Sequence, residues 1–290
     1  MAEDGFRLST SRVAIIGLGL MGASLAMDLR GHCAEILGAS RSPETLKFAL
    51  DRHIVNRVTE FGTQMDCELM VLAAPVRTIL QQLDQLRELP SGSPLKKPMV
   101  ILDLGSTKTE IVKAMRALPE RYDPIGGHPM CGKEVSGIRQ AEPGLYREKT
   151  FVLTPLERSS SQALELVNEL IETIGAEPLL LSPEKQDELV AMTSHLPYLA
   201  ASTLMKTAIS KDDPQLWQVA ASGFRDTTRL AASDLTMMMD ILLTNREAIL
   251  NALNAYQDGL NQLAILLRDG NEAGLRDYLN QTQKIRSGLF

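Results

Sequence analysis

A histidine flanked by small and rigid residues is the first candidate for chemistry in this sequence. His128 stands in the motif Gly-Gly-His-Pro at residues 126–129, in what we expect to be a loop. An imidazole titrates close to neutral pH, so it serves as a general acid or base. A histidine held between glycines and a proline is a better catalytic candidate than one on a helix face. From these residues alone, a purely structural histidine remains an equal alternative.

A glycine motif near the N-terminus predicts a nucleotide site. Gly-Leu-Gly-Leu-Met-Gly at residues 17–22 follows a short apolar run and precedes an amphipathic segment. In a dinucleotide site Gly17 makes the tight turn, Gly19 lets backbone N–H groups approach the pyrophosphate, and Gly22 lets the helix pack on the strand. The N-terminus of that helix then faces the negative charge. A tight strand–helix turn is the alternative, but the position of the motif favours nucleotide binding.

The residues about twenty positions further on bear on the choice of cofactor. An acidic side chain there normally accepts a hydrogen bond from the ribose 2′-hydroxyl of NAD. This sequence has Ser40, Arg41 and Ser42 instead. Hydroxyls and a guanidinium suit an anionic 2′-phosphate, so we favour NADP, with NAD still possible. Arg41 could equally be a solvated loop charge.

Three further motifs carry polar groups suited to a small anionic substrate. Ser106 follows an apolar run that ends at Asp103, where ligands lie in parallel sheets, although it could instead cap the next helix. His195 lies inside a predicted helix, where a buried structural histidine is the commoner outcome. Arg225 and Arg229 are one helical turn apart, a spacing suited to gripping a carboxylate, although surface arginine pairs are also common.

The elements that must position these groups divide the chain in two. Continuous apolar runs predict strands buried on both faces, as in a doubly wound parallel sheet covered by helices; they lie at residues 13–16, 36–39, 69–73, 100–103 and 151–153. Ser182 and Pro183 predict a helix start, and the pattern is helical from there on. We therefore place one domain at residues 10–181 and a second at 182–290.

Two smaller features refine this division. An apolar stripe over residues 241–267 predicts a single helix of about 28 residues, long enough to pack against more than its own domain. The stretch at residues 90–94, rich in proline and serine, predicts a surface loop.

Composition excludes several classes of protein. The 290 residues are 44% hydrophobic and 23% charged, which is typical of a folded globular protein. The net charge of −6 and the aromatic content of 4% argue against a nucleic-acid partner, which needs a concentrated basic patch. No apolar run reaches the roughly 18 residues of a membrane span. Three cysteines without CxxC spacing suggest neither disulfides nor a metal site. We expect a cytoplasmic protein without a membrane partner.

Taken together and in order, the motifs resemble one family, the prephenate/arogenate (cyclohexadienyl) dehydrogenases of tyrosine biosynthesis. The matching residues cover most of the chain, and the Gly-Gly-His-Pro and Gly-Phe-Arg-Asp-Thr-x-Arg elements are the most specific. They lie at residues 17–22, 103–108, 126–130, 194–197 and 222–229. The resemblance implies a Rossmann-type domain followed by an all-α dimerisation domain, and hence a homodimer.

The resemblance also implies an activity and roles for the candidate residues. The reaction is an NAD(P)-dependent oxidative decarboxylation of prephenate to 4-hydroxyphenylpyruvate, or of arogenate to tyrosine. His128 would polarise or deprotonate the ring hydroxyl, with Ser106 beside it near the nicotinamide. Arg229 would bind a substrate carboxylate, with Arg225 a weaker candidate, and His195 would line the site from the second domain.

Two departures and two rival functions accompany this resemblance. Tyr198 stands where many prephenate-preferring members have a second histidine, and Cys131 replaces a common alanine. One rival is a hydroxyisobutyrate-type dehydrogenase, but the lysines of the second half lack the glycine-rich context which that family places around its catalytic lysine. The other rival is a nucleotide sensor without catalysis, but such a protein should have lost the candidate catalytic side chains.

Overall fold

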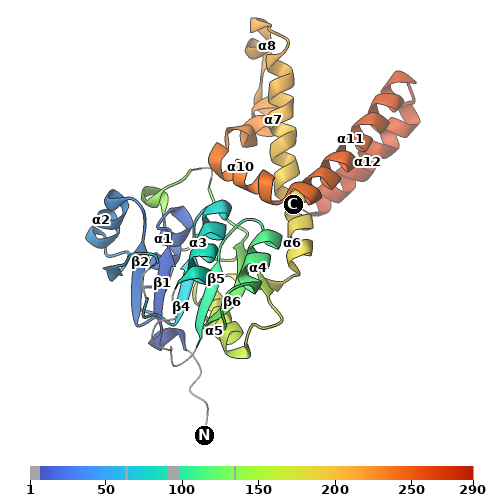
Figure 1. The fold of residues 1–290 in the computed structure, drawn as a ribbon. Coiled ribbons are helices and arrows are strands. Elements are labelled where there is room, and N and C mark those ends of the chain that lie inside the picture. The colour runs from blue at the N-terminus through green and yellow to red at the C-terminus, as the bar shows by residue number, and fades with distance from the viewer. Residues whose placement is uncertain (1–6, 63–64, 90–97, 134, 290) are drawn as a thin grey trace. The chain divides into compact units, whose positions relative to one another are not determined.

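The computed structural model describes residues 7–62, 65–89, 98–133 and 135–289 (Figure 1), so the loop expected at 90–94 lies outside the described residues. Within them, eight strands form one sheet in the order β3-β2-β1-β4-β5-β6-β7-β8. The predicted doubly wound α/β architecture is confirmed. The strands are β1 (Arg12–Ile16), β2 (Glu35–Ala39), β3 (Arg57–Val58), β4 (Leu69–Leu72), β5 (Met99–Asp103), β6 (Tyr122–Pro129), β7 (Thr150–Pro155) and β8 (Glu177–Leu180).

One strand pair departs from the expected parallel sheet. β6 and β7 run antiparallel, whereas the other neighbouring strands are parallel. A parallel pair needs a crossover connection, usually a helix. Among the described residues between β6 and β7, the chain makes only the short helical turn η2 (Ile138–Gln140), so it returns in the opposite direction.

Two helical layers cover the sheet, as the continuous apolar strands predict. Val13 and Ile15 of β1 share a buried cluster with α1 and α5 on one face. Ala14 and Ile16, which alternate with them, share a second cluster with α3 and α4 on the other face. The helices of this part are α1 (Leu20–Leu29), α2 (Pro43–Asp51), α3 (Val76–Glu88), α4 (Thr109–Arg116) and α5 (Ser161–Thr173), with the turn η1 (Leu8–Thr10) before β1.

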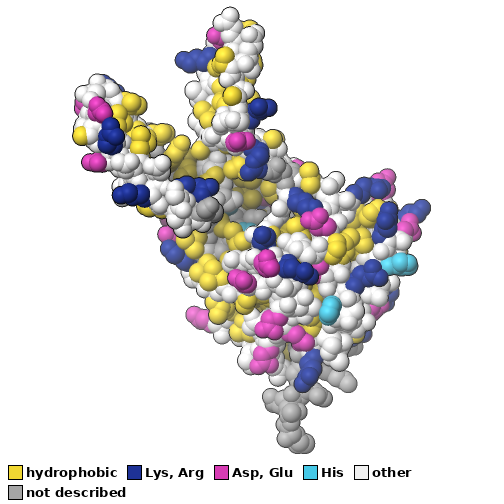
Figure 2. Space-filling model, turned by 180° about the vertical axis from the view of Figure 1, so that it is seen from behind, with side chains coloured by type: hydrophobic (Ala, Val, Ile, Leu, Met, Phe, Trp, Pro, Cys, Tyr) yellow, Lys and Arg dark blue, Asp and Glu magenta, His cyan; other side chains and the backbone are white. Residues whose placement is uncertain are grey.

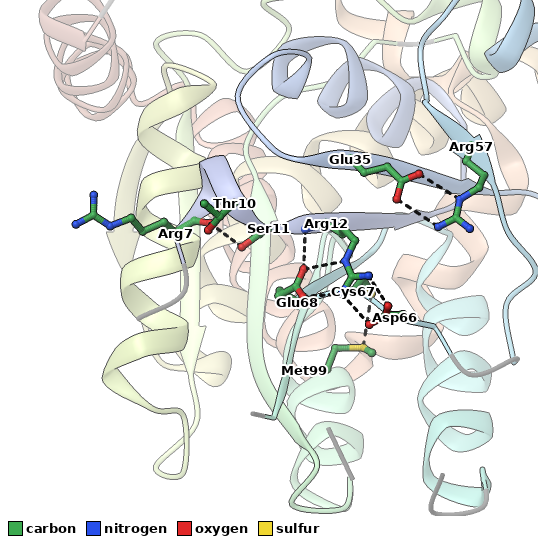
Figure 3. A network of polar contacts seen from close by, with 10 residues as sticks. All are labelled: Arg7, Thr10, Ser11, Arg12, Glu35, Arg57, Asp66, Cys67, Glu68 and Met99. Carbon is green, nitrogen blue, oxygen red and sulfur yellow. Dashed lines mark hydrogen bonds and ion pairs between the residues drawn. The ribbon is translucent and has the colours of Figure 1, made fainter. Parts of the chain in front are cut away.

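Ion pairs link the amino ends of neighbouring strands among β1 to β4 (Figure 3). The guanidinium of Arg12, at the start of β1, contacts Asp66 and lies 2.9 Å from Glu68 Oε1, just before β4. Arg57 of β3 pairs with Glu35 of β2 at 3.2 Å. These partly exposed pairs stabilise the sheet only modestly. They also mark the edge opposite the carboxyl ends of the strands, where ligands lie in such sheets.

The helical part begins where the sequence predicts. Ser182 Oγ accepts a hydrogen bond from the backbone N–H of Lys185 at 3.1 Å, with Pro183 at the first helical position. The elements that follow are α6 (Pro183–Val190), the π-helical turn η3 (Ala191–His195), α7 (Leu196–Ile209), α8 (Pro214–Val219), α9 (Ser222–Thr228), the 3₁₀ turn η4 (Arg229–Ala232), α10 (Leu235–Thr244), α11 (Arg246–Arg268) and α12 (Glu272–Leu289).

The prediction of one helix across residues 241–267 is wrong. Asn245 has φ −127° and ψ 35°, which ends α10 before α11 begins. Its side chain is used elsewhere, because the amide Nδ2 donates to the backbone oxygen of Asp187 at 2.8 Å. The apolar spacing in the sequence runs on past Asn245 without a sign of the break. The break itself coincides with a polar contact of the Asn245 side chain.

The described chain forms two compact units, Met1–Asn245 and Arg246–Phe290. In the second unit α12 packs back along α11, since a Cβ on Gly274 would meet Leu266 and one on Gly259 would meet Tyr278. The boundary predicted at residues 181/182 is a different division, and it stays a prediction. None of the helices in the described ranges has the length and apolar character needed to cross a membrane.

Candidate active site

The glycine turn after β1 has the geometry of a dinucleotide cradle. Gly17 has φ +111°, and a Cβ there would lie 2.5 Å from the carbonyl oxygen of Ala73. A Cβ on Gly22 would collide with the carbonyl oxygen of Gly17, so α1 packs closely on the turn. A Cβ on Gly19, directly before α1, would meet nothing within 4 Å. The turn thus leaves the backbone N–H groups at the N-terminus of α1 accessible, with free space beside them. A bound pyrophosphate requires both.

A cavity of about 830 Å³ opens from this turn toward the end of β2. Ser40, Arg41 and Ser42 line it, together with Gly17 and Gly19. Ser42 has a structural task as well, because its hydroxyl accepts from the N–H of Thr45 at 3.2 Å and caps α2.

Arg41 is exposed at the rim of this cavity, and no acidic side chain pairs with it in the part of the chain that the structure describes. The cavity therefore carries an exposed cation near the place where the ribose of a dinucleotide lies in this type of fold, with Glu60 also on its wall.

A second cavity, of about 420 Å³, adjoins the first. Gly19 and residues 73–75 line both cavities, so a dinucleotide on the glycine turn would extend into the second. Ser106 and His128 line it from the carboxyl ends of β5 and β6. Ser233, Asp234, Thr236 and Met237 line it from around the start of α10. The cavity thus brings together the two predicted catalytic residues and the nucleotide turn.

His128 lies in β6, and the expectation of a loop is wrong. Gly126 and Gly127 belong to the same strand, and their role is close packing: a Cβ on Gly126 would collide with Thr154 Oγ1 of β7. A Cβ on Gly127 would lie 2.7 Å from the carbonyl oxygen of Asp103. The glycines let β6 sit tightly between its neighbours, and the histidine is held by a strand, which is more rigid than a loop.

The surroundings of His128 favour its neutral form. Burial lowers its pKa to about 3, and the positive charges of Lys108 and His195 act in the same direction. Lys108 is itself fully buried and paired with Asp103. The carboxylate of Asp103 also accepts from the N–H groups of Gly105 at 2.7 Å and Gly127 at 3.0 Å. A neutral imidazole has a free ring nitrogen for a proton, which is what a general base needs.

Helix α6 docks on the turn that carries Ser106. The carboxylate of Asp187 accepts from the N–H groups of Lys108 at 2.7 Å and Thr109 at 2.8 Å, and so caps α4. The alternative role of Ser106 as a helix cap is therefore wrong, because α4 begins only at Thr109 and its cap comes from Asp187. Burial raises the pKa of the Asp187 carboxyl, which these hydrogen bonds partly offset.

Gln186, next to Asp187, connects the two predicted catalytic residues. Its Nε2 lies 2.6 Å from His128 Nδ1 and 3.3 Å from the backbone oxygen of Ser106. The side chain is 1% exposed. The sequence singled out neither Gln186 nor Asp187, because a polar residue in the first turns of a helix is usually solvated; their contacts span about 60 to 80 positions and have no local signal.

His195 stands behind the site and does not line either cavity. It ends the turn η3, is 1% exposed, and its Nδ1 lies 3.2 Å from Nδ2 of Asn245. Burial lowers its pKa to about 4. Its effect on the site is electrostatic, because a positive charge on His195 lowers the pKa of His128.

The two predicted substrate arginines lie outside both cavities. Arg225, in α9, and Arg229, the first residue of η4, have exposed side chains. Ser233, four residues after Arg229, does line the second cavity. The turn η4 thus ends directly before a residue that lines the cavity, and neither guanidinium lines it.

Comparisons with known proteins agree with this geometry. Residues 25–180 match the family described as “Prephenate dehydrogenase, nucleotide-binding domain”, and residues 182–281 match “Prephenate dehydrogenase, dimerization domain”. The chain belongs to the prephenate dehydrogenase family. This confirms the resemblance drawn from the motifs, and with it the Rossmann-type domain followed by a helical domain. The chain is therefore an NAD(P)-dependent oxidoreductase.

Individual relatives extend over nearly the whole chain. It is 30% identical to the prephenate dehydrogenase of Bacillus subtilis, over 96% of this chain and 76% of the relative. Prephenate dehydrogenase of Aquifex aeolicus, solved with hydroxyphenyl propionate and NAD+, is 31% identical with a TM-score of 0.88, covering 98% of this chain and 99% of that one. Arogenate dehydrogenase of Synechocystis is 29% identical with a TM-score of 0.80, covering 96% and 100%.

Proposed function

We propose that this chain oxidises and decarboxylates prephenate to 4-hydroxyphenylpyruvate, with His128 as the group that takes the proton of the ring hydroxyl. The observation that carries the proposal is a neutral histidine on the wall of a cavity that adjoins the dinucleotide cradle. A general base must lie where the substrate meets the cofactor and must be unprotonated at working pH. The position of His128 on the cavity wall and its lowered pKa both support this role.

Each side chain of the site has its own role in the proposed reaction. A nicotinamide cofactor held at the turn of Gly17 and Gly19 would supply the acceptor for the hydride that leaves C4 of the ring. The imidazole of His128 takes the proton from the C4 hydroxyl, which pushes electrons toward the departing hydride. Loss of the ring carboxylate as CO₂ leaves a phenolic ring, and the proton held at His128 returns to its oxygen. Ser106, on the same cavity wall, hydrogen-bonds the reacting hydroxyl and keeps it near the imidazole.

Arg229 is our candidate for the substrate carboxylate, with Arg225 as the weaker one. Prephenate carries two carboxylates, so it needs a fixed cation in addition to the general base. Arg229 comes one helical turn before Ser233, which lines the cavity. A guanidinium gives two parallel hydrogen bonds to a carboxylate and so fixes its orientation. His195, buried behind His128, supports the site from the helical part.

Arogenate is the second candidate substrate. Arogenate differs from prephenate in the side chain, where an ammonium-bearing carbon replaces the keto group. Tyr198 stands at a position where many prephenate-preferring members have a histidine, and the Synechocystis neighbour is an arogenate dehydrogenase. A neutral phenol adds no cation to repel that ammonium group, which supports acceptance of both substrates.

NADP is the cofactor that the rim of the first cavity favours. Arg41 is exposed there, and among the described residues no acidic side chain forms an ion pair with it. A 2′-phosphate would supply the missing anion, with the hydroxyl of Ser40 as a further donor. Ser42 already caps α2, so its contribution is mainly to hold the loop. NAD lacks this anion and leaves Arg41 to solvent.

The helical part, which we assign to residues 182–290, should form a homodimer. Its helices expose many large apolar side chains (Figure 2), among them Trp217, Val219, Leu250, Leu260 and Ile265. Apolar surface of this extent marks an interaction site, and a helical domain of this size buries too little on its own. The match of residues 182–281 to a dimerisation domain supports a second copy of this chain as the partner.

Initial rates test the function directly. The purified protein is assayed for cofactor reduction with prephenate and with arogenate, each with NAD and with NADP. Hydroxyisobutyrate serves as the control substrate. We expect turnover of prephenate with NADP and no turnover of the control. Cofactor reduction with hydroxyisobutyrate alone, or with none of the substrates, would contradict the proposal.

A further inference from the structure

The second cavity has a cation on its wall besides the groups already described. Within the described part of the chain, Lys133 is the one lysine or arginine among the residues that line this cavity, and Asp234 is the one acidic residue. The carboxylate of Asp234 accepts from the N–H of Met237 at 2.8 Å and so caps α10. Arg225 and Arg229 line neither cavity. Lys133 is therefore the residue of this wall that is suited to meet an anionic ligand.

The ammonium group of Lys133 is held in place and still has hydrogen-bonding capacity. Its Nζ lies 2.7 Å from Glu142 Oε2 and donates to the backbone oxygen of Gln140 at 3.3 Å. An ammonium group has three N–H donors, so these two contacts leave one. The side chains of Lys133 and Glu142 are 31% and 51% exposed, so solvent weakens their attraction. A second carboxylate can therefore share the ammonium group.

The partner of Lys133 is braced against the helix that follows the glycine turn. The backbone N–H of Glu142 donates to Ser24 Oγ at 3.1 Å, and the hydroxyl of Tyr146 donates to the backbone oxygen of Met21 at 2.7 Å. Ser24 and Met21 belong to α1, and Met21 itself lines the second cavity. The ion pair is thus fixed to the helix whose N-terminus borders the cofactor cradle.

We propose that Lys133 binds the side-chain carboxylate of the substrate, the one that remains in the product. This inference rests on the proposed function. His128 meets the hydroxyl on C4, and the side chain of prephenate is attached to the opposite ring atom, so its carboxylate ends far from His128. Lys133 is exposed whereas His128 is half-buried, so the more exposed part of the cavity receives the far end of the substrate. Arg229 then serves the second carboxylate, which is attached directly to the ring.

Lys133→Met tests this role, because it keeps the length of the side chain and removes the charge. We expect KM for prephenate to rise roughly three- to tenfold, as suits a partly exposed charge pair. The value of kcat should change less than about twofold, since the contact is equally strong in the ground state and the transition state. KM for NADP should stay unchanged. Lys113→Met, at an exposed position of α4 that lines neither cavity, is the matched control and should alter none of these values.

Glu142→Gln separates substrate binding from a structural role of the ion pair. Without the Glu142 carboxylate the ammonium group has one competitor fewer, so KM for prephenate should fall roughly two- to fivefold. If the ion pair only stabilised the loop, Lys133→Met and Glu142→Gln would change KM in the same direction, because each breaks the pair. A rise in KM for prephenate in both variants would overturn the proposal. An unchanged KM for prephenate in Lys133→Met, or a raised KM for NADP, would also overturn it.

Binding of two matched ligands tests the same contact without turnover. 4-Hydroxyphenylpropionate carries the side-chain carboxylate, and 4-propylphenol has a methyl group in its place. Calorimetry with saturating NADP should show that Lys133→Met raises the Kd of the propionate roughly three- to tenfold and leaves that of the propylphenol unchanged. Equal effects on both ligands, or none, would overturn the proposal. If prephenate is not turned over while the propionate still depends on Lys133, the proposed function fails and the carboxylate site stands.

Discussion

Reversing the charge of Arg41 should reverse the preference between NADP and NAD. Arg41 is exposed at the rim of the first cavity, so its bond to a 2′-phosphate lies at the weak end of charge-assisted hydrogen bonds, about 1.5 kcal/mol. An aspartate at this position adds repulsion of about 1 kcal/mol, for charges roughly 6 Å apart in water. The total of about 2.5 kcal/mol predicts a fall of roughly 60-fold in kcat/KM for NADP in Arg41→Asp.

The same variant should use NAD better than the wild-type protein does. The new carboxylate accepts a hydrogen bond from the free 2′-hydroxyl, which is worth about 0.5–1.5 kcal/mol, so kcat/KM for NAD should rise roughly two- to tenfold. The assay is initial velocity against each cofactor at saturating ring substrate.

Lys47→Asp is the matched control for Arg41→Asp. It changes the net charge by the same amount from an exposed position on α2 that does not line the cavity. We expect this control to alter neither cofactor by more than about twofold, since exposed charges are screened by solvent and salt. Two results would refute the reasoning: a wild-type enzyme that prefers NAD, or equal losses with both cofactors in Arg41→Asp.

Three further predictions follow from the site and the helical surface. Arg229→Ala should raise KM for the ring substrate roughly ten- to a hundredfold and leave KM for the cofactor unchanged, with a smaller effect in Arg225→Ala, and steady-state kinetics decide between the substrate and cofactor sites. Light scattering at micromolar concentration should give twice the chain mass of 31.8 kDa, and a monomer would contradict the dimer. The pKa values of His128 and His195 fall from 6.5 to about 3 and about 4 on folding, so the unfolded chain binds more protons and the free energy of unfolding should drop as the pH falls from about 6.5 to 4. Denaturant titrations of His195→Asn should show a shallower drop, and an unchanged slope would contradict the buried neutral histidine.

The sequence predicted those parts of the fold that depend on local pattern. The apolar runs located the central strands, and the Ser182–Pro183 signal located the start of α6, because burial on two faces and helix capping leave marks within a few residues. The continuous helix over residues 241–267 was wrong because the break at Asn245 comes from a contact with Asp187, far away in sequence. The antiparallel β7 was missed for a related reason, since strand direction depends on the connection before it.

The residues of the candidate site likewise fall into those that local motifs predicted and those that depend on long-range contacts. Ser106 and His128 were found because they stand in compact motifs at strand ends, and the structure brings them to one cavity. Gln186 was missed because its importance comes from a long-range contact, which no spacing rule signals. The loop expected around His128 is a strand because the glycines beside it serve close packing of neighbouring strands.

The most direct test of the account is the turnover of prephenate by His128→Asn. Asparagine keeps a polar side chain of similar reach but cannot take a proton from the ring hydroxyl. General acid–base assistance is worth roughly a hundred- to ten-thousandfold, so kcat should fall by that factor while the Kd for NADP and the circular dichroism spectrum stay unchanged. If His128→Asn retained near wild-type kcat with an unaltered pH profile, His128 would be a structural residue and the proposed mechanism would be wrong.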